Sequence, residues 1–272
     1  GAPAYDTASA LKPAQSPARV TMTAVAPLLF FSGLCALVYQ VAWLRELKLV
    51  FGASTAANAA VLAVFMGGLG VGGLLLGKRA DRLPRPLELY ANLELGVALS
   101  AALTPLLVLG GRKLYLAIGG SSVLGLSGAT IVRLLLTVVV LGVPTFLMGG
   151  TLPAAAKAVS SASDARRRDV GTLYAVNTIG AVTGAFAANF VLLEVFGTRM
   201  TLWLACLVNA LVGMTARAVS RRSATMRPDA PVPLPQQAGS GSVLPANLRW
   251  FPSAAAAIAG FAFLLMELVW YR

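Results

Sequence analysis

Long apolar runs separated by short polar connections dominate the chain from residue 23 onwards. Hydropathy and helix breakers divide this pattern into seven segments, each long enough to cross a bilayer as an α-helix. The predicted spans are approximately Thr23–Trp43, Ala56–Leu76, Leu87–Leu109, Ala129–Gly149, Val170–Phe196, Met200–Val219 and Phe251–Arg272. A further apolar stretch, Leu114–Leu126, is too short to span and contains Gly119 and Gly120, so it predicts a re-entrant or interfacial piece.

These segments define an all-α, polytopic bundle with four predicted parts. Residues 1–22 are polar and predict a disordered or surface-lying leader, since they lack the apolar core of a secretory signal. Residues 23–219 form the six-helix transmembrane unit. Residues 220–250 form a cytoplasmic linker rich in Pro, Gly and Ser, and residues 251–272 form the seventh helix.

The first segment ends in a polar and aromatic group of side chains that has a fainter copy at the end of the chain. The group comprises Tyr39, Gln40, Trp43 and Arg45, and the copy places Glu267, Trp270 and Arg272 opposite the last three. We therefore expect the seventh helix to open a second repeat that continues beyond Arg272. Trp and Arg commonly anchor helix ends at the membrane interface, which is the simpler interpretation of Trp43 and Arg45.

Composition makes this an integral membrane protein. The chain is 57% hydrophobic and only 12% charged, with a mean hydropathy of +0.77, whereas soluble domains have about 25% charged residues. The net charge of +12 would suggest nucleic acid in a soluble protein, but here the bilayer's anionic head groups are the expected partner. Histidine is absent and both cysteines lie in apolar segments, so we expect buried thiols, and no metal, haem or other cofactor.

Basic residues are distributed unevenly between the two sides of the predicted membrane. Thirteen Lys and Arg residues follow the second, fourth and sixth segments, and five follow the first, third and fifth. The positive-inside rule then places the N-terminus in the cytoplasm. A bacterial inner membrane is the expected location.

Among the polar residues within the predicted spans, Glu94, Arg133, Asn177 and Glu194 are the candidates for interactions at membrane depth. Such groups are costly in lipid and usually face the bundle interior with a partner. At about 1.5 Å of depth per residue, Glu94 matches Asn177, and Arg133 matches Glu194. The structural interpretation is that these residues tie helices together or extend to the membrane interface. The functional alternative is that Glu94 lines a polar cavity for a cation.

The second segment is rich in glycine and ends in a basic turn. Its glycines predict close packing of helix backbones, or alternatively a gliding surface as in a transporter. The turn reads Gly77-Lys-Arg-Ala-Asp81-Arg82-Leu-Pro84-Arg85. Asp81 can cap the following segment or bind a neighbouring helix end, and the arginines, Arg82 among them, hold the turn at the interface.

That turn resembles the G-x-x-x-D-R-x-G-R signature of the major facilitator transporters, with Pro84 in place of a glycine. Longer stretches resemble the membrane region of multi-pass proteins that fuse major-facilitator-like helices to a spermidine synthase-like domain. They are SGLCALVYQVAWLREL, GGLGVGGLLLGKRADR, GVPTFLMGGTLPAAAKA and GTLYAVNTIGAVTGAFAANFVLLEVFG. The resemblance implies a major-facilitator-like topology followed by a soluble aminopropyltransferase-like domain. In that domain a glycine-rich turn and acidic residues would bind decarboxylated S-adenosylmethionine and the polyamine.

The chain contains no such glycine-rich turn with an acidic residue after it, so no catalytic residue carries over and we expect no aminopropyl transfer by this chain alone. Three functions remain open. The chain could anchor or feed a spermidine synthase-like catalytic part, or it could be half of a transporter for a small, possibly cationic solute. It could also be a non-catalytic subunit or assembly factor of a larger membrane complex.

Overall fold

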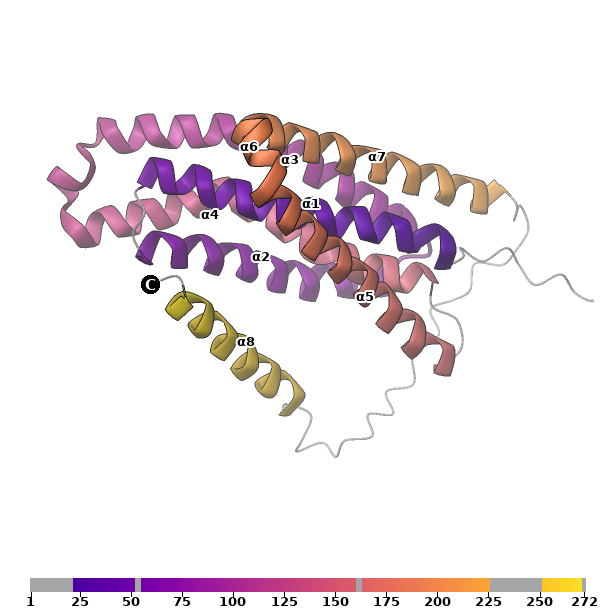
Figure 1. The fold of residues 1–272 in the computed structure, drawn as a ribbon. Coiled ribbons are helices and arrows are strands. Elements are labelled where there is room, and N and C mark those ends of the chain that lie inside the picture. Colours follow the sequence, from indigo (N-terminus) through magenta and orange to yellow (C-terminus); the bar gives the residue numbers. More distant parts are fainter. Residues whose placement is uncertain (1–21, 52–54, 160–162, 226–250, 271–272) are drawn as a thin grey trace, which may run out of the picture.

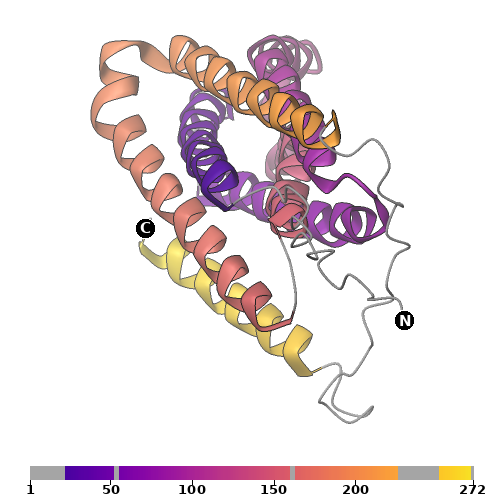
Figure 2. The ribbon, with the colours of Figure 1, turned by 90° about the vertical axis from the view of Figure 1, so that its right-hand side faces the viewer.

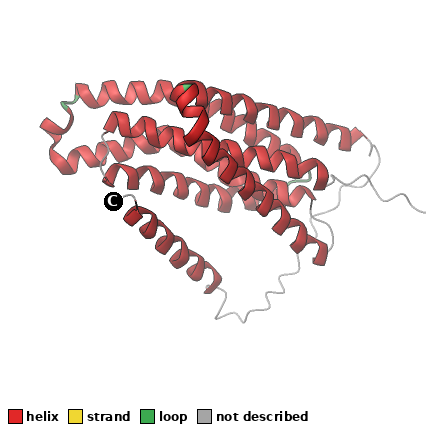
Figure 3. Cartoon of the chain, in the orientation of Figure 1, coloured by secondary structure: helices red, strands yellow, loops and turns green. Residues whose placement is uncertain are grey.

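The computed structural model describes residues 22–51, 55–159, 163–225 and 251–270, and every regular element in these ranges is a helix (Figures 1 and 3). This confirms the all-α prediction. The elements are α1 (Met22–Phe51), α2 (Thr55–Arg82), α3 (Pro86–Ala117), α4 (Gly120–Val159), α5 (Ser163–Ala187), the π-helix η1 (Ala188–Leu192), α6 (Leu193–Val195), α7 (Gly197–Thr225) and α8 (Phe251–Trp270). The predicted leader and most of the predicted linker lie outside the described residues.

Six of these helices are long and apolar enough to cross a membrane, which confirms the prediction of a multi-pass unit. The six spans are Met22–Leu49, Val61–Arg82, Pro86–Ala117, Ser127–Val159, Asp169–Val195 and Gly197–Ser223. Most extend beyond the ranges that hydropathy predicts, because helical hydrogen bonding continues into the polar flanks. The seventh predicted span is helical as α8, which lies apart from the bundle (Figure 1).

The stretch Leu114–Leu126 is helical in two parts, and its predicted re-entrant or interfacial position stays a prediction. Its first residues extend α3 to Ala117, and its last residues open α4. Gly119 and Gly120 join the two helices with φ values of 87° and 57°, and Gly125 bends the start of α4 with a φ of 63°. Residues with a Cβ rarely adopt positive φ, so the glycines make a tight helical hairpin here.

In a view along the bundle, α1 lies near its middle, and the other long helices surround it (Figure 2). The closest helix pairs are α2 with α4, α1 with α5, α3 with α4, and α3 with α7. The most deeply buried large side chains are Tyr39 and Trp43 of α1, Phe65 of α2 and Tyr90 of α3. The core therefore forms around α1, the segment that carries the predicted polar and aromatic group.

Glycines bring α2 and α4 into direct backbone contact, which confirms the packing prediction for part of the glycine-rich segment. A Cβ on Gly68 or Gly72 would collide with Thr145 or with the Phe146 carbonyl. Gly67 and Gly70 have no neighbour on that side, and both are exposed. One face of the segment therefore packs tightly and the opposite face remains open.

The α1–α5 crossing repeats the α4–α2 crossing residue by residue. In α5, Gly180 lies against the Phe30 carbonyl of α1, and Gly33 of α1 lies against the Asn177 carbonyl. In the other crossing, Gly72 of α2 lies against the Phe146 carbonyl of α4, and Gly149 lies against the Leu69 carbonyl. The spacing of phenylalanine and glycine is the same in α1 and α4. In both crossings, a glycine of each helix thus lies against a backbone carbonyl of the other.

Candidate functional site

Glu94 lies in a polar cluster at the junction of α1, α3 and α7. Its side chain is only 1% exposed, and its Oε1 accepts a 2.6 Å hydrogen bond from the Ser32 hydroxyl of α1. Asn209 of α7 donates from Nδ2 to the Glu94 backbone carbonyl at 2.8 Å. Tyr90 is buried one turn before Glu94, and its hydroxyl has no hydrogen-bond partner among the described residues. We name Ser32, Tyr90, Glu94 and Asn209 the Glu94 cluster.

The predicted pairing of Glu94 with Asn177 is wrong. Asn177 lies on α5, where its carbonyl and its Oδ1 pack against Gly33, while Glu94 bonds to α1 and α7. The prediction from depth along the helices considered Asn177 as a partner of Glu94. It did not consider the hydroxyl side chains or Asn209. Depth alone also cannot tell which helix is adjacent, and α3 packs closely on α7 and α4 rather than on α5.

Trp43 is a core residue, so its predicted role as an interfacial anchor is wrong. It is fully buried, stacks on Tyr39 with ring centroids 5.2 Å apart, and donates from Nε1 to the Thr104 hydroxyl at 2.9 Å. Gln40 is half-buried beside this pair and Arg45 is exposed, as an interfacial arginine would be. The helix continues eight residues beyond Trp43, which places the indole inside the bundle.

Arg133 pairs with Tyr115 of α3. The predicted pairing of Arg133 with Glu194 is therefore wrong. Its Nη2 donates to the Tyr115 hydroxyl at 3.0 Å, and its guanidinium lies 5.4 Å from the centre of that ring. Glu194 is exposed on α6. Because α3 continues past Leu109, where the sequence predicts its end, Tyr115 lies on a helix that packs directly against α4.

Asp81 lies at the basic end of α2 and ties it to α4. Its Oδ1 is 3.3 Å from Lys157 Nζ, which matches the expectation of a contact with a neighbouring helix end. Arg82 is exposed at the same end. Glu267, the remaining candidate, lies in α8, and its side chain is outside the described residues.

The exposed surface of α5 and η1 is more mixed in character than the exposed middle of α4. The middle of α4 exposes only aliphatic side chains such as Val138, Val139 and Val143, as lipid requires. This surface exposes the aliphatic side chains of Ile179, Val182 and Val191. Its exposed side chains also include Thr178, Thr183 and Phe186 of α5 and Asn189 and Phe190 of η1. We name these five residues the α5 face.

The local backbone geometry of η1 positions the side-chain amide of Asn189, the one amide of the α5 face. Asn189 lies in the π-helical turn η1 and donates from Nδ2 to the Ala185 carbonyl at 2.9 Å. A π-turn shifts the backbone hydrogen bonds, and such turns are frequent at functional sites. The Leu192 carbonyl at the end of this turn accepts a hydrogen bond from Thr201 of α7 at 2.9 Å. The irregular end of α5 is thus held in place by α7.

The sequence prediction missed Ser32, Thr104, Tyr115 and Asn209, which form hydrogen bonds with the predicted residues, and it also missed the buried Tyr90. The available signal was that each is polar and lies inside or beside an apolar segment. Among the described residues, no group of three His, Cys, Asp or Glu side chains could hold a metal ion. Cys35 and Cys206 are free and buried, as predicted.

Together these groups tie helices to one another, and the described residues form no constellation for nucleophilic or acid–base catalysis. Comparison of the chain with protein-family models, with curated proteins and with solved structures finds no match.

Proposed function

We propose that this chain is one half of a two-part helical membrane module of the major facilitator type, and that the α5 face contacts the second part. The module carries no transfer chemistry of its own. The module either anchors the partner that completes it or delivers a small polar solute to that partner.

The observation that carries this proposal is the polar and aromatic character of the α5 face. Helix surfaces in contact with lipid tails are aliphatic, and exposed polar groups at membrane depth generally face protein or a water-filled cavity. The exposed middle of α4 follows that rule, whereas the α5 face exposes Asn189 and an aromatic pair, Phe186 and Phe190, with ring centroids 4.6 Å apart.

The shared glycine pattern of the α1–α5 and α4–α2 crossings supports the proposed architecture. Three-helix repeats of opposite orientation within each six-helix half are a feature of major facilitator transporters. Here Gly33 and Gly180 in one crossing take the places of Gly149 and Gly72 in the other. The basic turn after α2 and the long stretches that resemble spermidine synthase-like membrane proteins support the same assignment.

The helix α8 supports the presence of further helical structure. It packs closely against none of the other described helices, and Ile258 and Phe261 are 69% and 65% exposed. An apolar helix of this kind needs lipid or helices on all sides. A second half, from this chain or from another, would supply the helices and would also cover the α5 face.

Site-directed spin labelling of the full-length protein in lipid vesicles tests the proposal. Nitroxides at Thr183→Cys and Phe190→Cys are compared with one at Val138→Cys, with Cys35 and Cys206 replaced by Ala. We expect low oxygen accessibility at the two α5 positions, since protein or water covers them, and high accessibility at Val138→Cys, which faces lipid.

The accessibility of a water-soluble nickel reagent then separates the two roles. High nickel accessibility on α5 would favour a solute pathway, and low accessibility to both reagents would favour a docked helical partner. Oxygen accessibility on α5 as high as that at Val138→Cys would show a lipid-facing surface and would refute the proposal.

A further inference from the structure

The open face of α2 changes from apolar to basic along its length. Val71, Leu74 and Leu75 are exposed at 53%, 67% and 55%. Lys78, Arg79 and Arg82 follow on the same side of the helix, at spacings of three and four residues, and all three are exposed. Higher up, Gly67 and Gly70 have no neighbour within contact distance and leave this side of α2 uncovered. This surface is apolar at membrane depth and cationic at its end.

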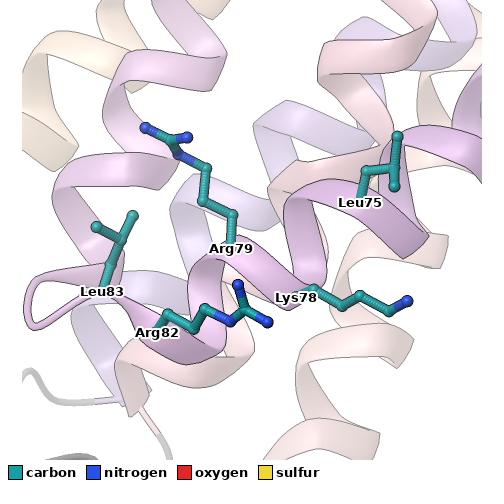
Figure 4. A pocket seen from close by; sticks show the side chains of 5 residues that line it. All are labelled: Leu75, Lys78, Arg79, Arg82 and Leu83. Carbon is teal, nitrogen blue, oxygen red and sulfur yellow. The ribbon is translucent and has the colours of Figure 1, made fainter.

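A pocket of about 510 Å³ opens at the basic end of this face, lined by Leu75, Lys78, Arg79, Arg82 and Leu83. Figure 4 shows Arg79 and Arg82 on the last turn of α2, with Lys78 on the side nearer Leu75 and Leu83 beyond them. Two aliphatic and three cationic side chains therefore line one cavity. Its size is within the range of small-ligand sites.

The three cations have no acidic partner in the described part of the chain. The nearby carboxylates are already engaged, since Asp81 lies 3.3 Å from Lys157 of α4 and Glu88 lies 3.8 Å from Arg85. Uncompensated cations at the end of a membrane helix attract anionic head groups. The positive charge of Lys78, Arg79 and Arg82 is thus available to an external anion.

We propose that this pocket binds one anionic phospholipid. The phosphate contacts Lys78, Arg79 and Arg82, and an acyl chain lies along Leu75, Leu74 and Val71. A free phosphate would use only the basic end of this surface, whereas a lipid matches both its charge and its apolar continuation. The inference is independent of the proposed function, because it concerns α2 and not the α5 face.

Native mass spectrometry of the purified full-length protein, titrated with phosphatidylglycerol, tests the site. Each Lys or Arg near a membrane surface strengthens anionic-lipid binding by about fivefold, so K78Q/R79Q/R82Q is expected to weaken the first binding event by about a hundredfold. R79K/R82K keeps the charge and is expected to retain binding. Circular dichroism verifies that each variant remains helical.

The control is R221Q/R222Q, which removes exposed charge from the end of α7 on the same side of the bundle. We expect it to leave the first phosphatidylglycerol in place. Equal weakening by this control would show a diffuse attraction and would overturn the site. Phosphatidylcholine binding as tightly as phosphatidylglycerol would exclude head-group recognition, and glycerol 3-phosphate competing at equal concentration would show a phosphate site without a lipid chain.

Discussion

At the scale of single residues, Glu94 connects three helices. The carboxyl accepts from Ser32 of α1, and the backbone carbonyl accepts from Asn209 of α7. A buried polar group without a partner is costly in an apolar interior, and more so when it is ionised. The Glu94 cluster satisfies much of that requirement, so the geometry favours a tie between helices over a cation cavity.

Substitutions at Glu94 distinguish these two roles. Glu94→Gln keeps the side-chain volume and an acceptor for Ser32, so we expect the unfolding free energy to fall by less than about 1 kcal/mol. Glu94→Ala leaves a cavity and removes the Ser32 partner, with an expected loss of about 2–4 kcal/mol. Thermal unfolding in detergent measures both. If Glu94→Gln were as damaging as Glu94→Ala, the charge itself would be what the bundle needs.

Asn209→Ala provides an independent measurement at the same cluster. It removes the bond from α7 to the Glu94 carbonyl, and interhelical hydrogen bonds in membrane proteins contribute about 0.6–1.7 kcal/mol. We expect a loss of stability in that range. A neutral result would indicate that the helix–helix contact of α3 with α7 depends on packing alone.

At the scale of helices, glycine position decides how closely two backbones approach. In α2 the glycines at 68 and 72 face α4, while those at 67 and 70 face away. Composition alone does not distinguish these four glycines, yet only two of them contact another helix. The same holds in α5, where Gly180 touches α1 and Gly171 touches nothing.

Alanine substitution in α2 tests this division directly. Gly72→Ala would drive a Cβ into the Phe146 carbonyl, so we expect the helices to separate, at a cost of about 1–3 kcal/mol. Gly70→Ala, two residues away in open space, is expected to be neutral or to stabilise by up to about 1 kcal/mol through helix propensity. Unfolding temperatures of the two variants in the same detergent give the comparison. Equal destabilisation would contradict the assigned face.

At the scale of the whole molecule, six spans place the ends of α2, α4 and α7 on one side and the α3–α4 hairpin on the other. The basic residues predict that the first side is cytoplasmic. Six of the seven predicted spans are found among the described helices, and the direction in which they cross the membrane stays a prediction.

Cysteine labelling in intact cells measures that direction. In a protein without Cys35 and Cys206, we expect Lys113→Cys to react with a membrane-impermeant maleimide from outside. Pro84→Cys, in the turn between α2 and α3, should react only after the membrane is opened. Both positions are exposed, so accessibility to solvent is matched. The reverse labelling pattern would invert the topology.

By itself, the sequence determined the membrane class, six of its seven predicted spans, part of the glycine-rich packing and the burial of both cysteines. These follow from hydropathy and small-residue spacing, which are local properties of each segment. It also identified Glu94, Trp43 and Arg133 as unusual, but not their environments. The predicted pairs of Glu94 with Asn177 and of Arg133 with Glu194, and the exposure of Trp43, were wrong.

Only the tertiary structure decided which helices are neighbours, and therefore which polar groups meet. Depth along a helix is set by local sequence, but adjacency depends on how all six helices pack together. Glu94 thus meets Ser32 and Asn209, and Arg133 meets Tyr115. The sequence likewise does not show that the α1–α5 and α4–α2 crossings share a pattern of glycine–carbonyl contacts. That pattern depends on backbone contacts between segments far apart in sequence.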